Sequence, residues 1–263
     1  MKVVAFSGGR SSAYMLYHLV HLGEKPDLVL FTNTGKERPE TLDFIHECEQ
    51  QIFPIKWLEY LPNSPGYKIV DFETAARDGE PFAELTQKRS YLPNRVTRLC
   101  TADLKIKPFE KFLRHNYPQK PYVKFLGFRY DEKHRADNVD VSKLPKGVTV
   151  RCPMVEWQIT KLDVLDFWKT MPFDLKIHSA KGNCDLCFFK GWPKLVSILR
   201  QDGYELAEWW IEQEKKHNAR FHPVHSYEKI LYFAKNQLHM DFNDLEFGGF
   251  DDQTSCGSFM CTD

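Results

Sequence analysis

The segment Ser-Gly-Gly-Arg-Ser-Ser at residues 7–12 has the residue types of a phosphate-binding loop. Glycine lets the backbone approach a phosphate closely, and the amides at the start of a following helix favour anionic oxygens. The spacing matches neither the Walker loop nor the dinucleotide-binding glycine pattern, and an ordinary strand-to-helix turn has a similar composition. The candidate phosphate-binding residues are Ser7, Gly8, Gly9, Arg10, Ser11 and Ser12.

The sequence around this loop predicts the elements that hold it. The apolar run Lys2–Phe6 is typical of a buried strand, and residues 11–22 carry apolar side chains at helical spacing. Strands are further expected at residues 27–33, 55–58, 122–127 and 148–153, and helices at residues 39–51, 106–116, 161–171, 194–201 and 204–217. This alternation predicts an α/β fold, a mostly parallel sheet with helices on both faces. The loop then lies at the carboxyl end of the first strand, where such sheets bind ligands.

The composition changes near residues 182–187, where strand patterns stop and cysteines appear. We therefore expect two parts: an α/β domain at residues 1–181 that carries the loop, and a Cys-rich helical region at residues 182–263 packed on it. The 263 residues suffice for such an arrangement.

The charge balance limits the classes of partner. Lys and Arg number 36, equal to Asp and Glu, so no overall field draws the protein to nucleic acid or to an anionic membrane. No apolar run reaches the roughly 20 residues that span a bilayer, and no signal-peptide pattern is present. We expect a cytoplasmic protein without a membrane partner, in which seven cysteines serve metal or thiol chemistry rather than a disulfide framework.

The loop resembles the PP-loop of the ATP pyrophosphatase superfamily, also called adenine nucleotide alpha hydrolases, although many members have Asp where this chain has Ser11. FTNTGKERPET (residues 31–41) and GFRYDEKHR (residues 127–135) resemble segments of the phosphoadenosine phosphosulfate (PAPS) reductase family. The resemblance covers residues 3–200 and implies a nucleotide-binding domain of this fold that holds ATP or PAPS. The further nucleotide-binding residues that it implies are Thr32, Asn33, Thr34, Gly35, Gly127, Phe128 and Arg129.

A basic stretch at residues 88–114 is the candidate site for the anionic end of a substrate. Arg95, Arg98, Lys105 and Lys107 are grouped suitably to hold phosphate or sulfate oxygens. We assign catalytic roles to Arg98 and Lys105, and treat Lys107, Lys111 and Arg114 as a solvated helix face. Single-stranded nucleic acid is a second interpretation, since aromatic residues in the stretch could stack bases.

The cysteines predict a metal centre. Cys184 and Cys187 have the two-residue spacing that lets both sulfurs reach one metal ion. With Cys100 the pattern resembles the iron-sulfur adenylylsulfate reductases, which implies a four-iron four-sulfur (4Fe-4S) cluster, although Leu99 stands where those enzymes have a further cysteine. Zinc is the alternative. The candidates for the fourth ligand are Cys256, Cys261 and Cys152.

Three other groups of residues have less specific sequence patterns. Asp131, to which we assign a catalytic role, and Glu132 could bind Mg²⁺ or pair with nearby arginines. The histidines of HNARFHPVH (residues 217–225) have no recognisable zinc spacing, so surface or packing roles are expected. Trp210 should anchor the last predicted helix in a core.

Two enzyme activities fit this pattern, a sulfonucleotide reductase and an ATP pyrophosphatase-type sulfurtransferase. The first would use a thioredoxin-like reductant, and the second a sulfur donor. The PAPS reductases carry their nucleophile in a C-terminal Glu-Cys-Gly-Leu/Ile-His motif, of which Ser255 to Ser258 keep only Cys256 and Gly257, and this favours the second activity. A non-catalytic nucleotide sensor with a structural zinc site is the alternative outside enzymes.

Overall fold

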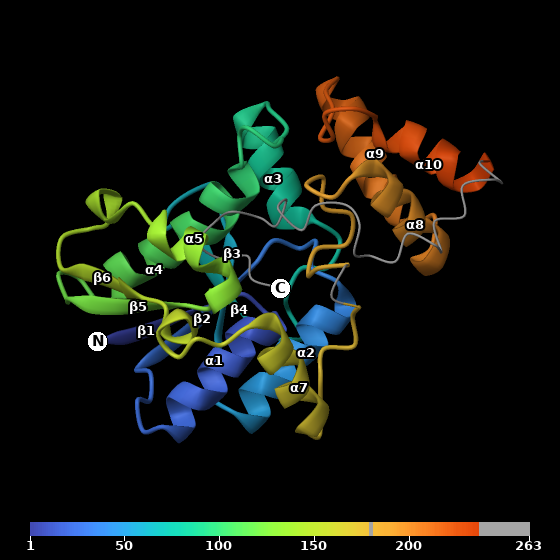
Figure 1. The fold of residues 1–263 in the computed structure, drawn as a ribbon. Coiled ribbons are helices and arrows are strands. Elements are labelled where there is room, and N and C mark those ends of the chain that lie inside the picture. The colour runs from blue at the N-terminus through green and yellow to red at the C-terminus, as the bar shows by residue number, and fades with distance from the viewer. Residues whose placement is uncertain (179–180, 237–263) are drawn as a thin grey trace.

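The computed structural model describes residues 1–178 and 181–236, and its centre is a six-stranded sheet with the order β4-β3-β2-β1-β5-β6 (Figure 1). The strands are β1 (Lys2–Phe6), β2 (Leu28–Asn33), β3 (Lys56–Tyr60), β4 (Tyr67–Val70), β5 (Tyr122–Leu126) and β6 (Val148–Arg151). All neighbours pair in parallel except β3 with β4. The predicted α/β class is confirmed. The antiparallel β4 was not predicted, because a four-residue edge strand carries too short a pattern.

Helices connect the strands and continue beyond the sheet. They are α1 (Arg10–His21), α2 (Pro39–Gln51), α3 (Glu80–Arg89), α4 (Lys107–Asn116), α5 (Lys133–Asp137), α6 (Pro153–Glu156), α7 (Lys161–Thr170), α8 (Trp192–Asp202), α9 (Leu206–His217) and α10 (Tyr227–Asn236). The sequence did not predict α3 or α10. Among the residues that the structure describes, no helix is long and apolar enough to cross a membrane.

The order of the strands fixes where a ligand can reach the sheet. The chain leaves β1 on one side to build β2 and β3, and later returns to the other side of β1 to build β5 and β6. This reversal lies between β1 and β5, and in open α/β sheets ligands bind at such a switch point, outside the carboxyl ends of the strands.

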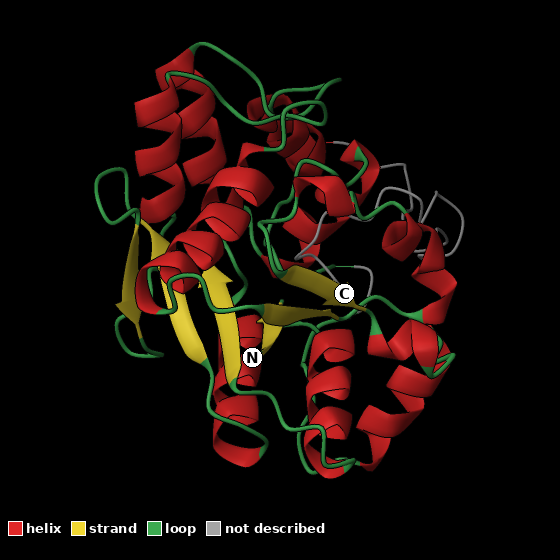
Figure 2. Ribbon diagram, turned by 90° about the vertical axis from the view of Figure 1, so that its left-hand side faces the viewer, coloured by secondary structure: helices red, strands yellow, loops and turns green. Residues whose placement is uncertain are grey.

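Two cores cover the two faces of the sheet, which lies between helical layers in Figure 2. One core joins the sheet to α1, α2 and α7, and includes Phe31, Phe44 and Trp168. The other joins it to α4 through Phe109 and Phe112. Thr160 caps α7 through a hydrogen bond from the Asp163 amide, in the capping-box arrangement.

A third core holds the C-terminal helices α8, α9 and α10 against α3 and the π-helical segment η1 (Cys100–Ile106). Trp210 is 1% exposed and stacks on Tyr227 with ring centroids 5.0 Å apart, which confirms its predicted anchoring role. Because Phe82 and Leu104 belong to this core, the helical part that begins near residue 182 shares its interior with segments that precede it in the chain.

Candidate functional site

The predicted phosphate loop lies between β1 and α1, and its shape is held by its own serines. The hydroxyl of Ser12 donates to the Gly9 carbonyl at 2.9 Å and accepts hydrogen bonds from the amide and hydroxyl of Ser7 at 3.3 and 2.9 Å. Gly8 has φ +82°, and a Cβ there would lie 2.7 Å from Cδ1 of Ile45. The loop is therefore a defined, buried turn that requires glycine at this position.

The end of β5 passes close to the phosphate loop. A Cβ on Gly127 would lie 3.1 Å from the Cα of Ser12, so glycine lets the two backbones approach each other. Two residues further on, the Nη1 of Arg129 donates to the Ser11 hydroxyl at 2.9 Å. Phe128, between them, is 2% exposed in the core on the α4 side of the sheet. The structure thus joins two segments that are 118 residues apart in the chain.

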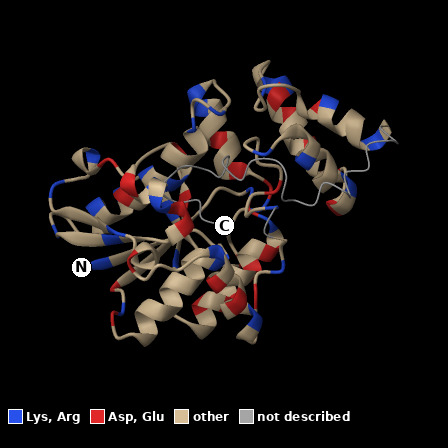
Figure 3. Cartoon of the chain, in the orientation of Figure 1, with Lys and Arg blue, Asp and Glu red and all other residues tan. Residues whose placement is uncertain are grey.

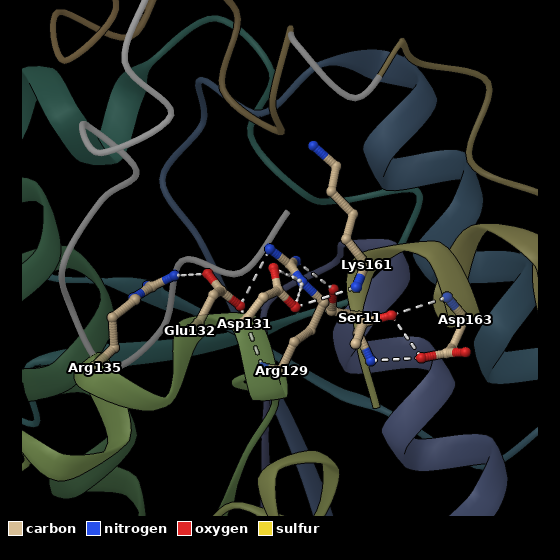
Figure 4. Close-up of polar contacts among 8 residues, drawn as sticks. Ser11, Arg129, Asp131, Glu132, Arg135, Lys161 and Asp163 are labelled. Carbon is tan, nitrogen blue, oxygen red and sulfur yellow. Dashed lines mark hydrogen bonds and ion pairs between the residues drawn. The ribbon is translucent and has the colours of Figure 1, made fainter. Parts of the chain in front are cut away.

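Acidic side chains hold Arg129 in place (Figure 4). Its Nε lies 3.3 Å from both oxygens of Asp131, and its Nη2 lies 3.4 Å from Glu132. Glu132 also pairs with Arg135, and Asp131 accepts a hydrogen bond from the Lys161 amide at 3.1 Å. Of the two alternatives for these carboxylates, pairing with arginine is the one observed. A Mg²⁺ ion bound there stays a prediction.

A pocket with about 410 Å³ of empty space, part of it open to solvent, lies beside this network. Its walls combine polar groups near the phosphate loop with apolar side chains of α7 and of the segment that follows α7. The lining residues are Arg10, Ser11, Arg129, Lys161, Val164, Leu165, Leu175, Ile177, His178, Gly182 and Asn183.

The guanidinium of Arg10 is occupied by protein groups. It forms a bidentate pair with Asp174 at 2.7 and 2.8 Å and donates to the carbonyls of Ile177, at 3.0 Å, and Leu175. Its own carbonyl accepts from Trp168. Arg10 therefore fastens the segment after α7 to the start of α1, and it offers a ligand mainly its backbone amide.

The end of β2 is built from buried polar residues. The side-chain amide of Asn33 donates to Glu59 at 2.7 Å and to the Ala76 carbonyl at 2.8 Å, while its oxygen accepts from the Gly35 amide at 3.0 Å. Asn33 is thus fully hydrogen-bonded within the protein. Thr32 and Thr34 are each 2% exposed in the same segment.

Three consecutive charged residues after this segment, which the sequence analysis did not single out, connect β2 to the C-terminal part. Lys36 pairs with Asp185 at 2.8 Å, and Arg38 pairs with Asp202 at 2.7 Å. Glu37 accepts from the Thr34 amide and hydroxyl at 2.8 and 2.7 Å. All three are at most 8% exposed. A Lys-Glu-Arg run directly after a buried strand was the signal available in the sequence.

The predicted anion-binding residues of the basic stretch separate in the structure. Lys105 lies in η1, is 5% exposed and has its Nζ 3.3 Å from Glu37. Arg98 lies before η1, with its guanidinium carbon 4.7 Å from the centre of the Phe189 ring. Lys105 therefore lies by the end of β2, whereas Arg98 lies against the segment that follows the CxxC pair.

The CxxC segment lies beside the phosphate loop. The side chain of Asn183 donates to the Ser7 carbonyl at 3.1 Å, and Cys184 forms a β-bridge with Glu37. Cys187 and Cys100 pack against the same C-terminal core, and Cys100 begins the π-helix η1. π-Helical turns are frequent at functional sites. The structure thus brings the CxxC segment to the phosphate loop and to the end of β2.

The described residues do not complete a metal site by themselves. Within residues 1–178 and 181–236, no three His, Cys, Asp or Glu side chains are grouped closely enough to hold a metal ion. Cys256 and Cys261 lie outside the described residues. Cys152 packs against the core on the α4 side, and burial, helped by Glu156 and Asp137, raises the pKa of its thiol to about 12. Cys48 is fully buried, as predicted.

Outside the site, charged residues of both signs are mixed, in agreement with the equal numbers of acidic and basic residues in the sequence. Figure 3 shows acidic and basic residues interspersed over the described helices and strands. The fold places the predicted phosphate loop at the switch point of the sheet, where open α/β proteins bind their ligands.

The phosphoadenosine phosphosulfate reductase domain matches residues 1–176, and the chain belongs to this family. It is 30% identical over 206 residues to the nin region protein ORF290 of Escherichia phage lambda, a match that covers 74% of this chain and 68% of that protein. It is 26% identical over 236 residues to the protein MJ0066 of Methanocaldococcus jannaschii, covering 80% of this chain and 44% of that longer protein. Membership of the family supports a nucleotide-related function.

Proposed function

We propose that the protein is an enzyme that binds an adenine nucleotide across the ends of β1, β2 and β5. The observation that carries the proposal is the 2.9 Å hydrogen bond from Arg129 to Ser11, which puts a buried guanidinium at the mouth of the phosphate loop. Arginine is suited to bidentate contact with phosphate oxygens. Asp131 is then a positioning residue, because it holds both Arg129 and the start of α7.

The loop supplies what the phosphate groups require. Its backbone amides open the first turn of α1, whose positive end favours anions. Thr34 and Gly35, at the end of β2, would border the ribose and base, and the reacting groups would lie at the pocket beside Arg129. In this arrangement Arg129 stabilises the negative charge that develops on a leaving phosphate.

The reaction that we favour is the splitting of ATP between its α- and β-phosphates. An oxygen of the acceptor attacks the α-phosphorus, the bond to the bridging oxygen breaks, and pyrophosphate leaves with the electron pair. A sulfur donor then displaces AMP from the adenylated acceptor. This choice is supported by Ser255 to Ser258, which lack the acid and the histidine of the reductase motif.

The second candidate reaction is sulfonucleotide reduction, and the family itself favours it. A thiolate would attack the sulfur of PAPS, the bond from that sulfur to the phosphate oxygen would break, and adenosine 3′,5′-bisphosphate would leave. A dithiol such as a thioredoxin would then release sulfite as the dithiol is oxidised to a disulfide.

We further propose that Cys100, Cys184 and Cys187 hold an iron-sulfur cluster, with Cys256 or Cys261 as the fourth ligand. Support comes from Cys100 and Cys187, which pack against one core, and from Cys184, which lies beside the end of β2. When bound, such a cluster would supply electrons or carry sulfur. The test is the absorbance near about 400 nm and the iron and sulfide content of anaerobically purified protein, both lost in Cys184→Ala. A colourless protein with one zinc would contradict the cluster and favour a zinc-stabilised sensor.

The nucleotide proposal is tested by calorimetric titration of wild type and Arg129→Met with ATP and with PAPS. Loss of a charged hydrogen bond costs about 1.5–3 kcal/mol, so Kd should rise at least about tenfold in the variant. Arg114→Met, which removes an exposed arginine of α4, is the matched control and should leave Kd unchanged. Ser11→Ala keeps the carboxylate network intact and should weaken binding less.

The same proteins then distinguish the two reactions. Release of AMP and pyrophosphate from ATP supports the sulfurtransferase, and release of sulfite and adenosine 3′,5′-bisphosphate from PAPS supports the reductase. If wild type binds neither nucleotide at millimolar concentration, or if Arg129→Met binds as wild type does, the proposed site is wrong.

A further inference from the structure

The pocket beside the phosphate loop is lined by charged residues of one sign. Its described lining residues include Arg10, Arg129 and Lys161, and no Asp or Glu is among them. The chain has equal numbers of acidic and basic residues, so its composition does not explain this difference. Apolar side chains of α7 and of the segment after it complete the wall, and a contact between charges is stronger where fewer water molecules screen it. These properties favour a ligand that brings negative charge into the pocket.

Two of these cations are held by carboxylates and fix the walls of the pocket. Arg10 pairs with Asp174 at 2.7 Å, which fastens the segment after α7 to the start of α1. Arg129 pairs with Asp131 at 3.3 Å, and Asp131 in turn accepts a hydrogen bond from the Lys161 amide at 3.1 Å. The backbone around the pocket is therefore tied together within the protein, so a ligand would not have to order it.

Lys161 is the third cation and the first residue of α7. The capping box of this helix and the hydrogen bond to Asp131 fix its backbone. In Figure 4 its side chain extends away from Asp131 and Asp163, the two carboxylates drawn on either side of its backbone. A fixed backbone thus carries the ammonium group of Lys161 to the pocket that it lines together with Arg129.

The order of the strands indicates which part of a nucleotide reaches Lys161. β2 and β5 are the two neighbours of β1 in the sheet. In the proposed arrangement the base and ribose lie at the end of β2, and the phosphate groups lie at the loop that follows β1. A phosphate chain that continues in the same direction reaches Arg129, which follows β5, and the pocket that Lys161 lines. The group farthest from the ribose would therefore lie at Lys161.

We propose that Lys161 binds the terminal anionic group of the nucleotide, which is the outer phosphates of ATP or the sulfate of PAPS. The inference rests on the proposed nucleotide site and adds to it the residue that selects nucleotides carrying this group. An ammonium group on a flexible stem is suited to phosphate or sulfate oxygens as a point charge. Arg98 and Lys105, which the sequence suggested for this role, are not among the described lining residues of the pocket, and Lys105 lies instead 3.3 Å from Glu37.

The experiment compares nucleotides that differ only in the terminal group, by calorimetric titration of the full chain. AMP lacks the outer phosphates of ATP, and adenosine 3′,5′-bisphosphate lacks the sulfate of PAPS. In Lys161→Met, Kd for ATP or PAPS should rise about tenfold, as expected for a lost charged hydrogen bond, while Kd for the shorter nucleotide of the same pair stays unchanged. The ratio of the two Kd values is the readout, because a variant that is merely less folded binds both nucleotides more weakly. The pair that shows the effect identifies the terminal group as phosphate or as sulfate.

Control variants separate this inference from the proposed function. Lys176→Met removes an exposed lysine of the segment after α7 that is not among the lining residues, and it should leave both Kd values unchanged. Lys161→Arg, which keeps the charge, should retain most of the preference for the longer nucleotide. If Arg129→Met weakens binding while Lys161→Met keeps the wild-type ratio, or weakens both nucleotides equally, the nucleotide site stands and the role of Lys161 is wrong. If wild type binds neither ATP nor PAPS, the proposed function fails, and the role of Lys161 fails with it.

Discussion

Replacement of the buried Lys124 by methionine should stabilise the protein at neutral pH. Lys124 lies in β5, between β1 and β6, and is 4% exposed. Its ammonium lies 4.5 Å from the centre of the Phe109 ring. Burial lowers the pKa of this lysine from 10.5 to about 8, and the charge of Glu110 offsets the effect only in part.

The magnitude follows from this difference in pKa. A difference of one in pKa corresponds to about 1.4 kcal/mol. Lowering the pKa of Lys124 from 10.5 to about 8 therefore costs about 3 kcal/mol of folding free energy at any pH where this lysine is charged in both the folded and the unfolded protein. The folded-state pKa is depressed, so the cost is complete below pH 8. It decreases as the pH rises toward 10.5, where the lysine is neutral in the folded and the unfolded state. Lys124→Met removes the cost at all pH values and should gain about 3 kcal/mol at pH 7.

The assay is urea unfolding of wild type and Lys124→Met between pH 7 and pH 10, with the free energy of unfolding from linear extrapolation. The difference between the two proteins should shrink from about 3 kcal/mol at pH 7 to under about 1 kcal/mol at pH 10, because other titrating groups cancel in the comparison. The exposed Lys120→Met should show no such trend. A difference that does not change with pH, or a variant less stable than wild type at pH 7, would refute the reasoning.

Two further substitutions test the supports of the proposed nucleotide site. Gly8→Ala should destabilise the protein by about 2 kcal/mol, because the backbone there is left-handed and the added Cβ would collide with Ile45. Gly23 is the control: it also has a left-handed backbone, at φ +76°, but no atom lies within 4 Å of an added Cβ, so Gly23→Ala should show the backbone strain alone. Equal losses of stability in urea unfolding for both glycines would contradict the contact. Lys36→Met should lower the free energy of unfolding by about 3 kcal/mol, because it leaves the carboxylate of Asp185 buried without its counter-charge. A decrease of less than about 1 kcal/mol would show that the Lys36–Asp185 pair contributes little to stability.

The turn between β1 and α1 and most of the strands could be predicted from the sequence because their signals are local. A glycine that must adopt φ +82° and an apolar strand before a helix are both visible within a few residues. The same holds for Thr160, whose capping box lies within one turn of α7. β4, by contrast, is too short for a pattern, and α3 lies in a polar stretch without clear apolar spacing.

The pairing of individual charges could not be predicted. Arg10 lies within the loop, yet its guanidinium pairs with Asp174, which is 164 residues distant in the chain. Lys105 and Arg98 are close in sequence, but they lie against Glu37 and Phe189 respectively. Long side chains reach in many directions, and only the packed neighbours decide which partner each one meets.

The sequence by itself determined the α/β class, the position of the glycine turn between β1 and α1 and the core role of Trp210, since each follows from local backbone preference or from the burial of apolar surface. Only the tertiary structure decided that Arg129 meets Ser11 and that Lys36 and Arg38 fasten the end of β2 to the C-terminal part. These contacts join distant segments, and the order of the strands and the docking of the helices on a shared core bring them together.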